Sequence, residues 1–451
     1  MPFLALIAMY AVQIARRPLD VRLKKRHAGP LAAAALLVVL YLTWDGLRPG
    51  GVSSAYFLGE FAGVTSVYLM TWSLVLATRL RWLEQWFGGM DRMYFWHKQY
   101  ALWAMLLLLP HILVTGRTGQ TGITATEAAR TEQVGRLLGV ISALGLLTLV
   151  AVSLARVSRI VALPYERWLL LHRFTGLLVL IALVHGWALD RVIGGSAALK
   201  AIYVLIGIAG MAAYGYDELI RRRRAPQADY TVRSVRRRAP DVIDVTLAPK
   251  GPAPLPVESG QFVYLSVGGS SAGREHPFSV AGTGPDGSVR LTVRALGRDT
   301  RGLYAGLREG LPATLSGPYG MFDHTLGGAR QIWIAGGIGI APFLGWVNGS
   351  DSDALPRVDL FYCTPSADEA PFLEELGAAV RRRPALRLHP VHSRSDGRLT
   401  VGKIQAVAGP LTPQTHVFLC GPVTMIEDLS SGLRRHGIPR DHLHAEHFAF
   451  R

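Results

Sequence analysis

The sequence predicts a multidomain membrane protein: a six-helix transmembrane bundle, then a soluble module made of an antiparallel β-barrel and an α/β domain with a parallel sheet. Half of the 451 residues are apolar, mean hydropathy is +0.25, and only 18% are charged, whereas soluble domains have about 25%. The apolar excess is confined to residues 1–216. Residues 217–451 alternate short apolar runs with Gly and Pro, as soluble α/β sequences do.

Six segments are long and apolar enough to cross a hydrocarbon core, which takes about 20 helical residues. They lie near residues 30–46, 56–78, 94–115, 134–155, 167–189 and 197–216. Residues 2–15 are also apolar but too few to span. We therefore expect residues 1–29 to form an interfacial helix followed by a basic cytosolic segment.

The charge distribution favours a membrane over nucleic acid. The net charge of +16 comes from 48 Lys and Arg against 32 Asp and Glu, and the basic residues stand in short runs beside apolar segments, as in Arg16–Arg17 and Arg221–Arg224. Such runs suit anionic headgroups, and basic loops stay in the cytosol. We expect a multi-pass protein of the plasma membrane with cytosolic N- and C-termini, whose third and fifth helices run outward.

Four histidines lie inside the predicted spans, where an ionisable group is costly and indicates function. The third helix carries His97 and His111, and the fifth carries His172 and His185. At about 1.5 Å per residue, the members of each pair stand roughly 20 Å apart along the membrane normal. We expect His97 to face His172 near the cytosol and His111 to face His185 near the outside. Each facing pair can then ligate one haem iron from both sides.

Other interpretations of these histidines exist. A lone intramembrane His is more often a hydrogen-bonded core residue, but four residues matched in depth favour haem. Zinc is disfavoured because the two histidines of one helix are too far apart to share an ion. The separation of 13 between His172 and His185 does not keep them on one face of an ideal helix. The fifth helix must therefore bend, or the two haems must meet it at different angles.

The first part of the soluble half predicts a small antiparallel barrel, because short alternating runs recur at regular spacing. The runs are Tyr230–Val235, Val242–Leu247, Gln261–Val267 and Val289–Ala295. Among them lie His276-Pro277-Phe278-Ser279, Arg294 and a turn at Thr300-Arg301-Gly302-Leu303. These residues can supply the apolar wall, polar contacts and cation that a flavin needs. Taken alone, His-Pro-Phe-Ser fits a strand-edge turn equally well.

The rest of the soluble half repeats strand, glycine-rich turn and helix. The apolar run Gln331–Ala335 precedes Gly336–Phe343, where glycines let a pyrophosphate approach the backbone at a helix N-terminus. Further strands predict a parallel sheet that binds a dinucleotide across its carboxyl edge; they are Val358–Cys363, Leu386–Val391 and the run starting at Val417. Ser393 and Arg394 follow a strand end, where a guanidinium can hold the 2′-phosphate of NADPH. A solvated surface Arg is the alternative, so NADH remains open.

In the order and spacing of these motifs, the sequence resembles the NADPH oxidase and ferric reductase superfamily, particularly its bacterial members, over nearly the whole chain. The resemblance rests on the two histidine pairs, His276–Ser279, Gly336–Phe343 and Cys420-Gly421-Pro422. It implies a six-helix haem domain over residues 30–220 and a ferredoxin-reductase-like module. That module would consist of an FAD domain (228–325) and an NAD(P)H domain (329–451).

The resemblance also implies roles for single residues. The metal ligands would be His97, His111, His172 and His185. FAD would contact His276, Pro277, Phe278, Ser279 and Arg294, with Gly302 and Leu303 near its phosphates. The nucleotide would contact Gly336, Gly337, Gly339, Pro342, Ser393, Arg394, Gly421 and Pro422. Cys420 would lie by the nicotinamide, and Phe448, with Phe450 as the alternative, would cover the flavin ring.

The implied activity is electron transfer from cytosolic NAD(P)H through FAD and two b-type haems to an acceptor outside, with O2 giving superoxide as the leading case. Superoxide-forming oxidases tend to carry a second His one turn beyond the outer ligand of the third helix, where Thr115 stands. Leu178 stands where an aromatic is common between the haem levels. A ferric-chelate reductase, an electron-donor subunit for an extracytoplasmic partner and a haem-free anchor for a flavin reductase are the alternatives.

Overall fold

The computed structural model describes residues 27–48, 50, 52–115, 126–158, 160–161, 163–221, 227–268, 275–349 and 355–447. The chain divides into two compact units, the first reaching Arg223 and the second beginning at Arg224. The expected N-terminal interfacial helix lies outside the described residues, as do Phe448 and Phe450.

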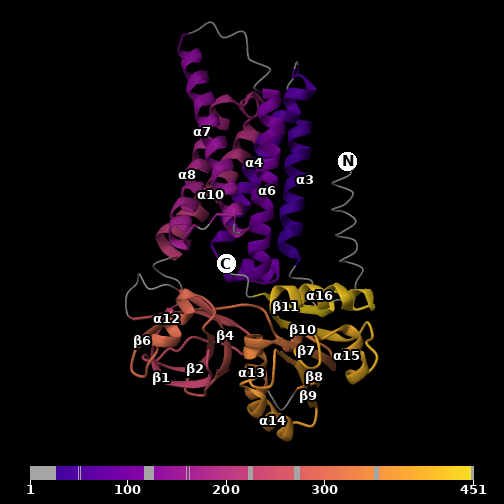
Figure 1. Cartoon of the computed structure of the whole chain (residues 1–451). Coiled ribbons are helices and arrows are strands. Elements are labelled where there is room, and N and C mark those ends of the chain that lie inside the picture. Colours follow the sequence, from indigo (N-terminus) through magenta and orange to yellow (C-terminus); the bar gives the residue numbers. More distant parts are fainter. Residues whose placement is uncertain are drawn as a thin grey trace. The chain divides into compact units, whose positions relative to one another are not determined.

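The first unit is a helical bundle (Figure 1). Among the described residues, six helices are long and apolar enough to cross a membrane, which confirms the six predicted spans. Leu113, Leu144 and Leu205 are among many large apolar side chains that the bundle leaves exposed, as a lipid-facing surface requires. The helices are α3 (Ala28–Gly46), α4 (Ser54–Ala77), α6 (Met90–Thr115), α7 (Thr126–Val157), α8 (Tyr165–Leu189) and α10 (Ala197–Gly215). The chain is therefore a multi-pass membrane protein.

Hydrogen bonds from side chains to neighbouring helices hold the bundle together. The Ser66 hydroxyl of α4 donates to the carbonyl of Ala104 in α6 at 3.0 Å, and the Tyr203 hydroxyl of α10 donates to the carbonyl of Leu183 in α8 at 3.0 Å. Bonds of this kind satisfy polar groups that lipid cannot solvate. Short helices α5 (Arg81–Phe87) and α9 (Arg191–Gly194) lie between the spans.

The second unit begins with a closed antiparallel barrel of strand order β1-β2-β5-β4-β3-β6. Its interior is filled by fully buried branched side chains, among them Val245, Leu265, Leu291 and Leu315. The strands are β1 (Gln227–Ala239), β2 (Val242–Pro249), β3 (Phe262–Val267), β4 (His276–Thr283), β5 (Val289–Arg294) and β6 (Pro312–Tyr319). The predicted barrel is confirmed.

A five-stranded parallel sheet of order β11-β10-β7-β8-β9 follows the barrel. Its strands are β7 (Arg330–Gly336), β8 (Arg357–Thr364), β9 (Leu386–His392), β10 (His416–Gly421) and β11 (Leu443–His447). The helices connecting or flanking them are α13 (Ala341–Asn348), α14 (Leu373–Arg382), α15 (Val401–Ala408) and α16 (Val423–Arg435). The predicted α/β domain is confirmed, because β7, β8, β9 and β10 coincide with the four expected strands.

Local structure corrects one prediction and excludes one alternative interpretation. The segment predicted as a turn at Thr300–Leu303 lies inside helix α12 (Arg298–Gly306), so that prediction is wrong. The helix forms because Thr300 Oγ1 accepts the N–H of Gly297 at 2.9 Å and caps the first turn. The His276–Ser279 motif lies within strand β4, where it pairs with β3 from Phe262 to Leu265, and is not a strand-edge turn.

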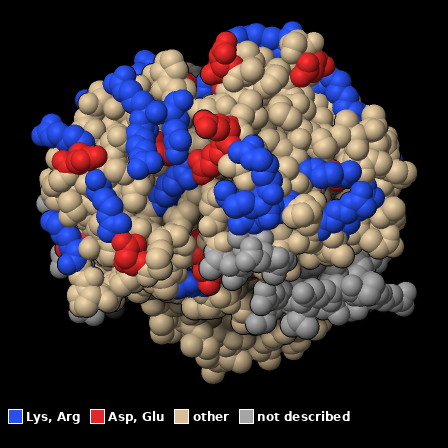
Figure 2. Space-filling view, turned by 90° about the horizontal axis from the view of Figure 1, so that it is seen from below, with Lys and Arg blue, Asp and Glu red and all other residues tan. Residues whose placement is uncertain are grey.

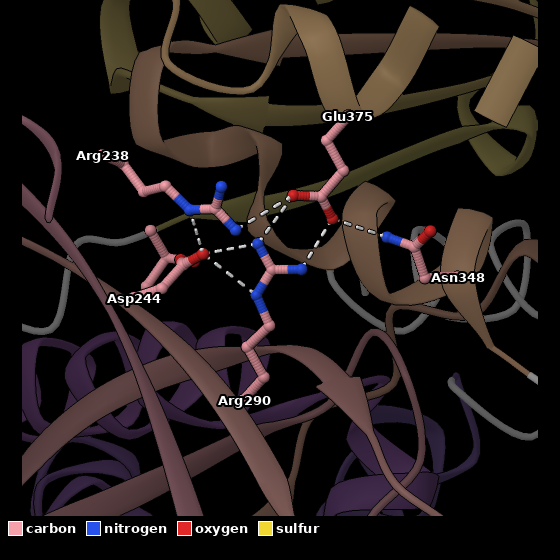
Figure 3. Close-up of polar contacts among 6 residues, drawn as sticks. Arg238, Asp244, Arg290, Asn348 and Glu375 are labelled. Carbon is pink, nitrogen blue, oxygen red and sulfur yellow. Dashed lines mark hydrogen bonds and ion pairs between the residues drawn. The ribbon is translucent and has the colours of Figure 1, made fainter. Parts of the chain in front are cut away.

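A network of ion pairs joins the barrel to the α/β domain (Figure 3). Arg290 of β5 reaches Asp244 of β2 at 2.5 Å and Glu375 of α14 at 2.6 Å. Arg238 of β1 also contacts both carboxylates, at 2.7 and 3.4 Å, and Asn348 of α13 donates to Glu375 at 2.8 Å. Two guanidinium groups thus link one carboxylate from each domain.

Basic side chains on the face seen in Figure 2 are interspersed with acidic ones. Ion pairs elsewhere in the second unit follow the same pattern, such as Arg233 with Asp286 at 2.7 Å and Arg387 with Asp359 at 2.7 Å. Several basic side chains of the second unit are therefore paired with a nearby carboxylate.

Candidate functional site

The four intramembrane histidines form two facing pairs. The rings of His97 and His172 have their centroids 6.1 Å apart, and those of His111 and His185 are 6.2 Å apart. The pairing is the one predicted from depth in the membrane.

Both separations fit one metal ion between two imidazoles. A metal–imidazole bond is about 2 Å long, and each ring nitrogen lies about 1 Å from its ring centre, so two axial ligands need centroids about 6 Å apart. The distances of both pairs meet this requirement without movement of the helices.

Hydrogen bonds fix the tautomer of three rings. Nδ1 of His97 lies 2.8 Å from the carbonyl oxygen of Ser73, Nδ1 of His111 lies 3.0 Å from that of Gly59, and Nδ1 of His185 lies 2.8 Å from that of Gly135. A carbonyl only accepts, so each Nδ1 carries the proton and leaves the lone pair of Nε2 for a ligand bond. This is the arrangement in which a second partner orients a ligating His.

His172 is held differently. Its Nδ1 lies 3.4 Å from the hydroxyl of Ser153, which donates its one hydrogen to the carbonyl of Leu149 at 2.7 Å. The hydroxyl therefore accepts from His172, and it also accepts from Nε1 of Trp168 at 3.0 Å. Trp168 stacks on the imidazole with centroids 5.0 Å apart. Because Nδ1 of His172 is hydrogen-bonded, its Nε2 remains available for a ligand bond, as in the other three rings.

Two glycines make room for the outer pair. A Cβ at Gly63 would lie 2.6 Å from Nδ1 of His111, and a Cβ at Gly139 would lie 2.6 Å from Cε1 of His185. Each glycine stands one helical turn from the carbonyl that holds the same ring, at Gly59 or Gly135. The small residues and the carbonyls together form the seats of the two imidazoles, and these residues fit a haem ligated by two histidines.

The spacing of 13 on the fifth helix is accommodated by side-chain direction. α8 is a single helix from Tyr165 to Leu189. The rings of His172 and His185 are both hydrogen-bonded to α7, to Ser153 and to Gly135 respectively. Each ring then faces α6 although the two Cα atoms do not share one helix face. The planes of the facing rings meet at 67° in one pair and 84° in the other.

In the second unit, three polar side chains from distant parts of the sequence converge. The Ser279 hydroxyl of β4 donates to the carboxylate of Glu446 in β11 at 3.2 Å, and Sγ of Cys420 at the end of β10 lies 3.9 Å from the same oxygen. All three residues are buried. Burial, together with the charge of Glu446, raises the pKa of the Cys420 thiol, which therefore stays protonated.

Glu446 was not among the predicted site residues. It begins the tail segment whose aromatic residues were considered for the flavin, but nothing in its local sequence links it to Ser279. Only the parallel pairing of Cys420 with Glu446 in adjacent strands brings the carboxylate to this position. Phe448, the second catalytic candidate, lies outside the described residues.

The other flavin candidates lie in strand β4 and in helix α12. Phe278 is buried in the barrel core, and Pro277 pairs with Tyr264, which packs edge-on against Tyr319 at 5.5 Å. In helix α12, Leu303 packs against the barrel core and Gly302 lies a turn beyond Gly297, the N-cap residue. In the first turn of this helix, the N–H of Arg301 donates to the carbonyl of Gly297 at 2.9 Å.

The glycine-rich segment forms the end of β7 and a short 3₁₀ turn that leads into α13. Gly339 is packed so closely on the backbone of Cys420 and Gly421 that a Cβ would collide with it. Gly336 lies against Pro422, and Pro342 stands in the first turn of α13. The segment thus brings the ends of β7 and β10 together at the carboxyl edge of the sheet.

A cavity of about 210 Å³ opens beside Gly337 between the barrel and the α/β domain. Arg294 lines it, and its Nε bonds Asp241 at 2.7 Å. Gly337 has a φ of +54°, a left-handed conformation that favours glycine. The remaining lining residues are Ala239, Pro240, Val242, Ile338, Tyr362, Asp368, Glu369, Pro371 and Phe372.

Comparison with known proteins matches three segments of the chain. Residues 62–183 match the model of the ferric reductase like transmembrane component, residues 228–322 match an FAD-binding domain, and residues 333–431 match an oxidoreductase NAD-binding domain. The first segment contains His97, His111 and His172; the third contains the glycine-rich turn and Cys420.

Curated relatives resemble part of the chain. It is 30% identical over 212 residues to the carnitine monooxygenase reductase subunit of Escherichia coli, which covers 45% of this chain and 63% of that protein. It is 30% identical over 149 residues to methane monooxygenase component C of Methylosinus trichosporium, which covers 32% and 43%. The chain thus spans less than two thirds of the length of these relatives.

Among solved structures, the Amycolatopsis cytochrome P450 reductase is 26% identical, with 50% of this chain and 71% of that chain covered and a TM-score of 0.42. The three matched segments follow one another along the chain: first the transmembrane component, then the FAD-binding domain, then the NAD-binding domain. This order of domains is the architecture of flavocytochromes of the NADPH oxidase and ferric reductase type, and the two soluble domains are those of an NAD(P)H oxidoreductase.

Proposed function

We propose that the protein carries electrons from cytosolic NAD(P)H across the plasma membrane to an acceptor on the outer face, using FAD and two b-type haems. The observation that supports this most strongly is the pair of facing histidine couples, each about 6 Å between ring centres and each with Nε2 left for a metal. When bound, FAD accepts a hydride and releases single electrons, which haem irons can carry onward.

The residues of the second unit have defined tasks in this proposal. Gly336, Gly337 and Gly339 hold the nucleotide pyrophosphate at the start of α13, and Arg394 contacts the 2′-phosphate of NADPH. Cys420 lies by the nicotinamide as a neutral thiol, because its burial keeps it protonated. Ser279 and Glu446 close the same site from the barrel side and from β11.

In the membrane unit, His97 with His172 and His111 with His185 would each hold one haem between two imidazoles. Haems held in this way would supply one-electron transfer toward the acceptor. Oxygen, giving superoxide, is the leading acceptor.

A ferric chelate is the second candidate, and Thr115 favours it. The Thr115 hydroxyl donates to the carbonyl of His111 in its own helix at 2.7 Å. The outer end of α6 therefore presents a backbone-bonded hydroxyl where superoxide-forming oxidases tend to carry a second imidazole. Arg48 adds a cation near the same end of α4, where it bonds Val52 and Ser54.

The decisive experiment is a reduced-minus-oxidised absorption spectrum of the full chain in detergent, with added FAD and NADPH as reductant, followed by air or ferric citrate. We expect a b-type spectrum with two haems per chain that NADPH reduces. The faster reoxidant identifies the preferred acceptor. Reduction without reoxidation by either one would indicate a donor subunit for a protein partner, and absence of haem would reduce the membrane unit to an anchor.

A further inference from the structure

The sheet order determines which part of a dinucleotide meets which strand. β10 ends at Gly421 beside the Ser279–Glu446 contact, and β7, its neighbour, leads into the glycine-rich turn. With the nicotinamide at β10 and the pyrophosphate at β7, as the proposed function has it, the adenosine half extends over β8 and β9. The inference below rests on that function.

The ends of β8 and β9 form one joined surface. The N–H of Ser393 donates to the carbonyl of Thr364 at 2.9 Å, and the N–H of Arg394 donates to that of Pro365 at 3.1 Å. Thr364 Oγ1 also lies 3.0 Å from Nδ1 of His392. The segment after β9 is thereby fixed against the loop after β8, and side chains of both loops are available to an adenosine ribose.

A carboxylate of the β8 loop stands against the expected phosphate ligand. Arg394 and Glu369 form an ion pair at 2.8 Å, in which the Arg394 side chain is 70% exposed and the Glu369 side chain 35%. Glu369 also faces the cavity that contains Gly337, and Ser366 donates to its carboxylate at 3.4 Å. Glu369 is thus placed between the pyrophosphate turn and the guanidinium.

We propose that Glu369 is a specificity-determining residue that opposes Arg394 in the choice between NADH and NADPH. A carboxylate accepts a hydrogen bond from the 2′-hydroxyl of NADH, which is how acidic residues at such sheet edges read the ribose. The same carboxylate repels a 2′-phosphate and occupies the guanidinium that would bind it. The pair therefore allows both nucleotides to be used, and Arg394 alone would select NADPH.

The test measures kcat/KM of the full chain in detergent with NADH and with NADPH, with FAD present and ferricyanide as acceptor. Glu369→Gln should raise the NADPH-to-NADH ratio by roughly fivefold or more, mainly through KM, because it removes one charge of an exposed pair. Arg394→Ala should lower the ratio. Both shifts should shrink in high salt.

Matched controls separate this effect from a general change of charge. Glu374→Gln alters an exposed carboxylate on helix α14 and should leave the ratio within twofold of the parent value, roughly the scatter of such a measurement. Inhibition by 2′,5′-ADP, which carries only the adenosine end, should become tighter in Glu369→Gln, and inhibition by 5′-ADP should not.

Each outcome is decisive. An unchanged ratio in Glu369→Gln, or an equal shift in Glu374→Gln, overturns the role of Glu369 and leaves the electron-transfer function intact. A parent chain that oxidises neither nucleotide overturns the proposed function and this inference with it.

Discussion

Single residues decide where a metal-bound imidazole can sit in the membrane unit. His97, His111 and His185 each donate Nδ1–H to a backbone carbonyl of a neighbouring helix, and His172 donates to a hydroxyl. A backbone carbonyl in a helix cannot rotate, so the hydrogen bond that it accepts fixes both the tautomer and the orientation of the imidazole ring. The seats for the ligands are therefore largely made of backbone.

The glycine beneath an outer imidazole gives the first prediction. Gly139→Ala places a methyl group against His185, and we expect the variant to retain one haem per chain in place of two. Haem content per chain and the reduced-minus-oxidised spectrum measure this. Gly215→Ala is the control, because a Cβ at Gly215 meets nothing within 4 Å. Two haems per chain in Gly139→Ala would contradict the claim that His185 needs the space left by this glycine.

The two cysteines give a second prediction. Burial raises the pKa of Cys363 to about 12, and burial together with Glu446 raises the pKa of Cys420 well above its ordinary value. Thiolates are the reactive form, so iodoacetamide should modify neither residue appreciably at pH 8 in the folded protein. Mass spectrometry before and after denaturation measures the difference. Rapid alkylation of native Cys420 would contradict its protonated state.

At the scale of elements, the ion-pair network holds α14 and the barrel strands together. Burial opposes ionisation of Glu375, yet Arg290 and Arg238 lower its pKa below the ordinary value of 4.5. The carboxylate therefore stabilises the fold above that value, and the contribution is lost as the pH falls through the lowered pKa.

Glu375→Gln is the third prediction. The substitution removes one of the two carboxylates that pair with Arg290 in a largely buried network. We expect the free energy of unfolding to fall by about 2 kcal/mol, seen as a lower unfolding temperature at pH 7. The difference between variant and parent should narrow below pH 4.5. Thermal unfolding monitored by tryptophan fluorescence tests it, with Glu374→Gln on the same helix as the control. Equal unfolding temperatures at pH 7 would argue against the network.

Elements with a strong local signal were predictable from sequence. The six spans follow from apolar length, and strands such as Val242–Pro249 and Arg357–Thr364 follow from alternating or continuous apolar runs. β6 was not predicted, because Gly317 and Pro318 interrupt its pattern and each is a poor strand former. α12 was missed because Gly302 suggested a turn, whereas the helix is set by its cap at Gly297.

Long-range partners were the least predictable part of the site. Depth in the membrane was enough to pair His97 with His172, because both lie on long helices whose rise per residue is fixed. Ser279 and Glu446 are 167 residues apart, and Arg394 finds Glu369 only because β8 and β9 are adjacent. Such contacts depend on sheet order, which one sequence does not reveal.

At the scale of the whole molecule, the proposed direction of electron flow requires a fixed topology. Gly194 lies in a predicted outer loop and Ser158 in a predicted cytosolic one, so a membrane-impermeant maleimide should label Gly194→Cys in intact cells and should leave Ser158→Cys unlabelled until the cells are opened. The native thiols give little background because Cys420 and Cys363 remain protonated. The reverse labelling pattern would show that the chain has the opposite orientation in the membrane.

The facing histidines also bear on how the protein is made. α6 is held along α4 and α8 along α7, and each proposed iron would tie α6 to α8, joining one helical hairpin to the other. A chain inserted before its porphyrin arrives would keep four unligated imidazoles inside the bundle and would lack the links that the irons would make between α6 and α8. We expect membrane proteases to remove such chains, so the steady-state amount of the protein in cells would follow the supply of haem.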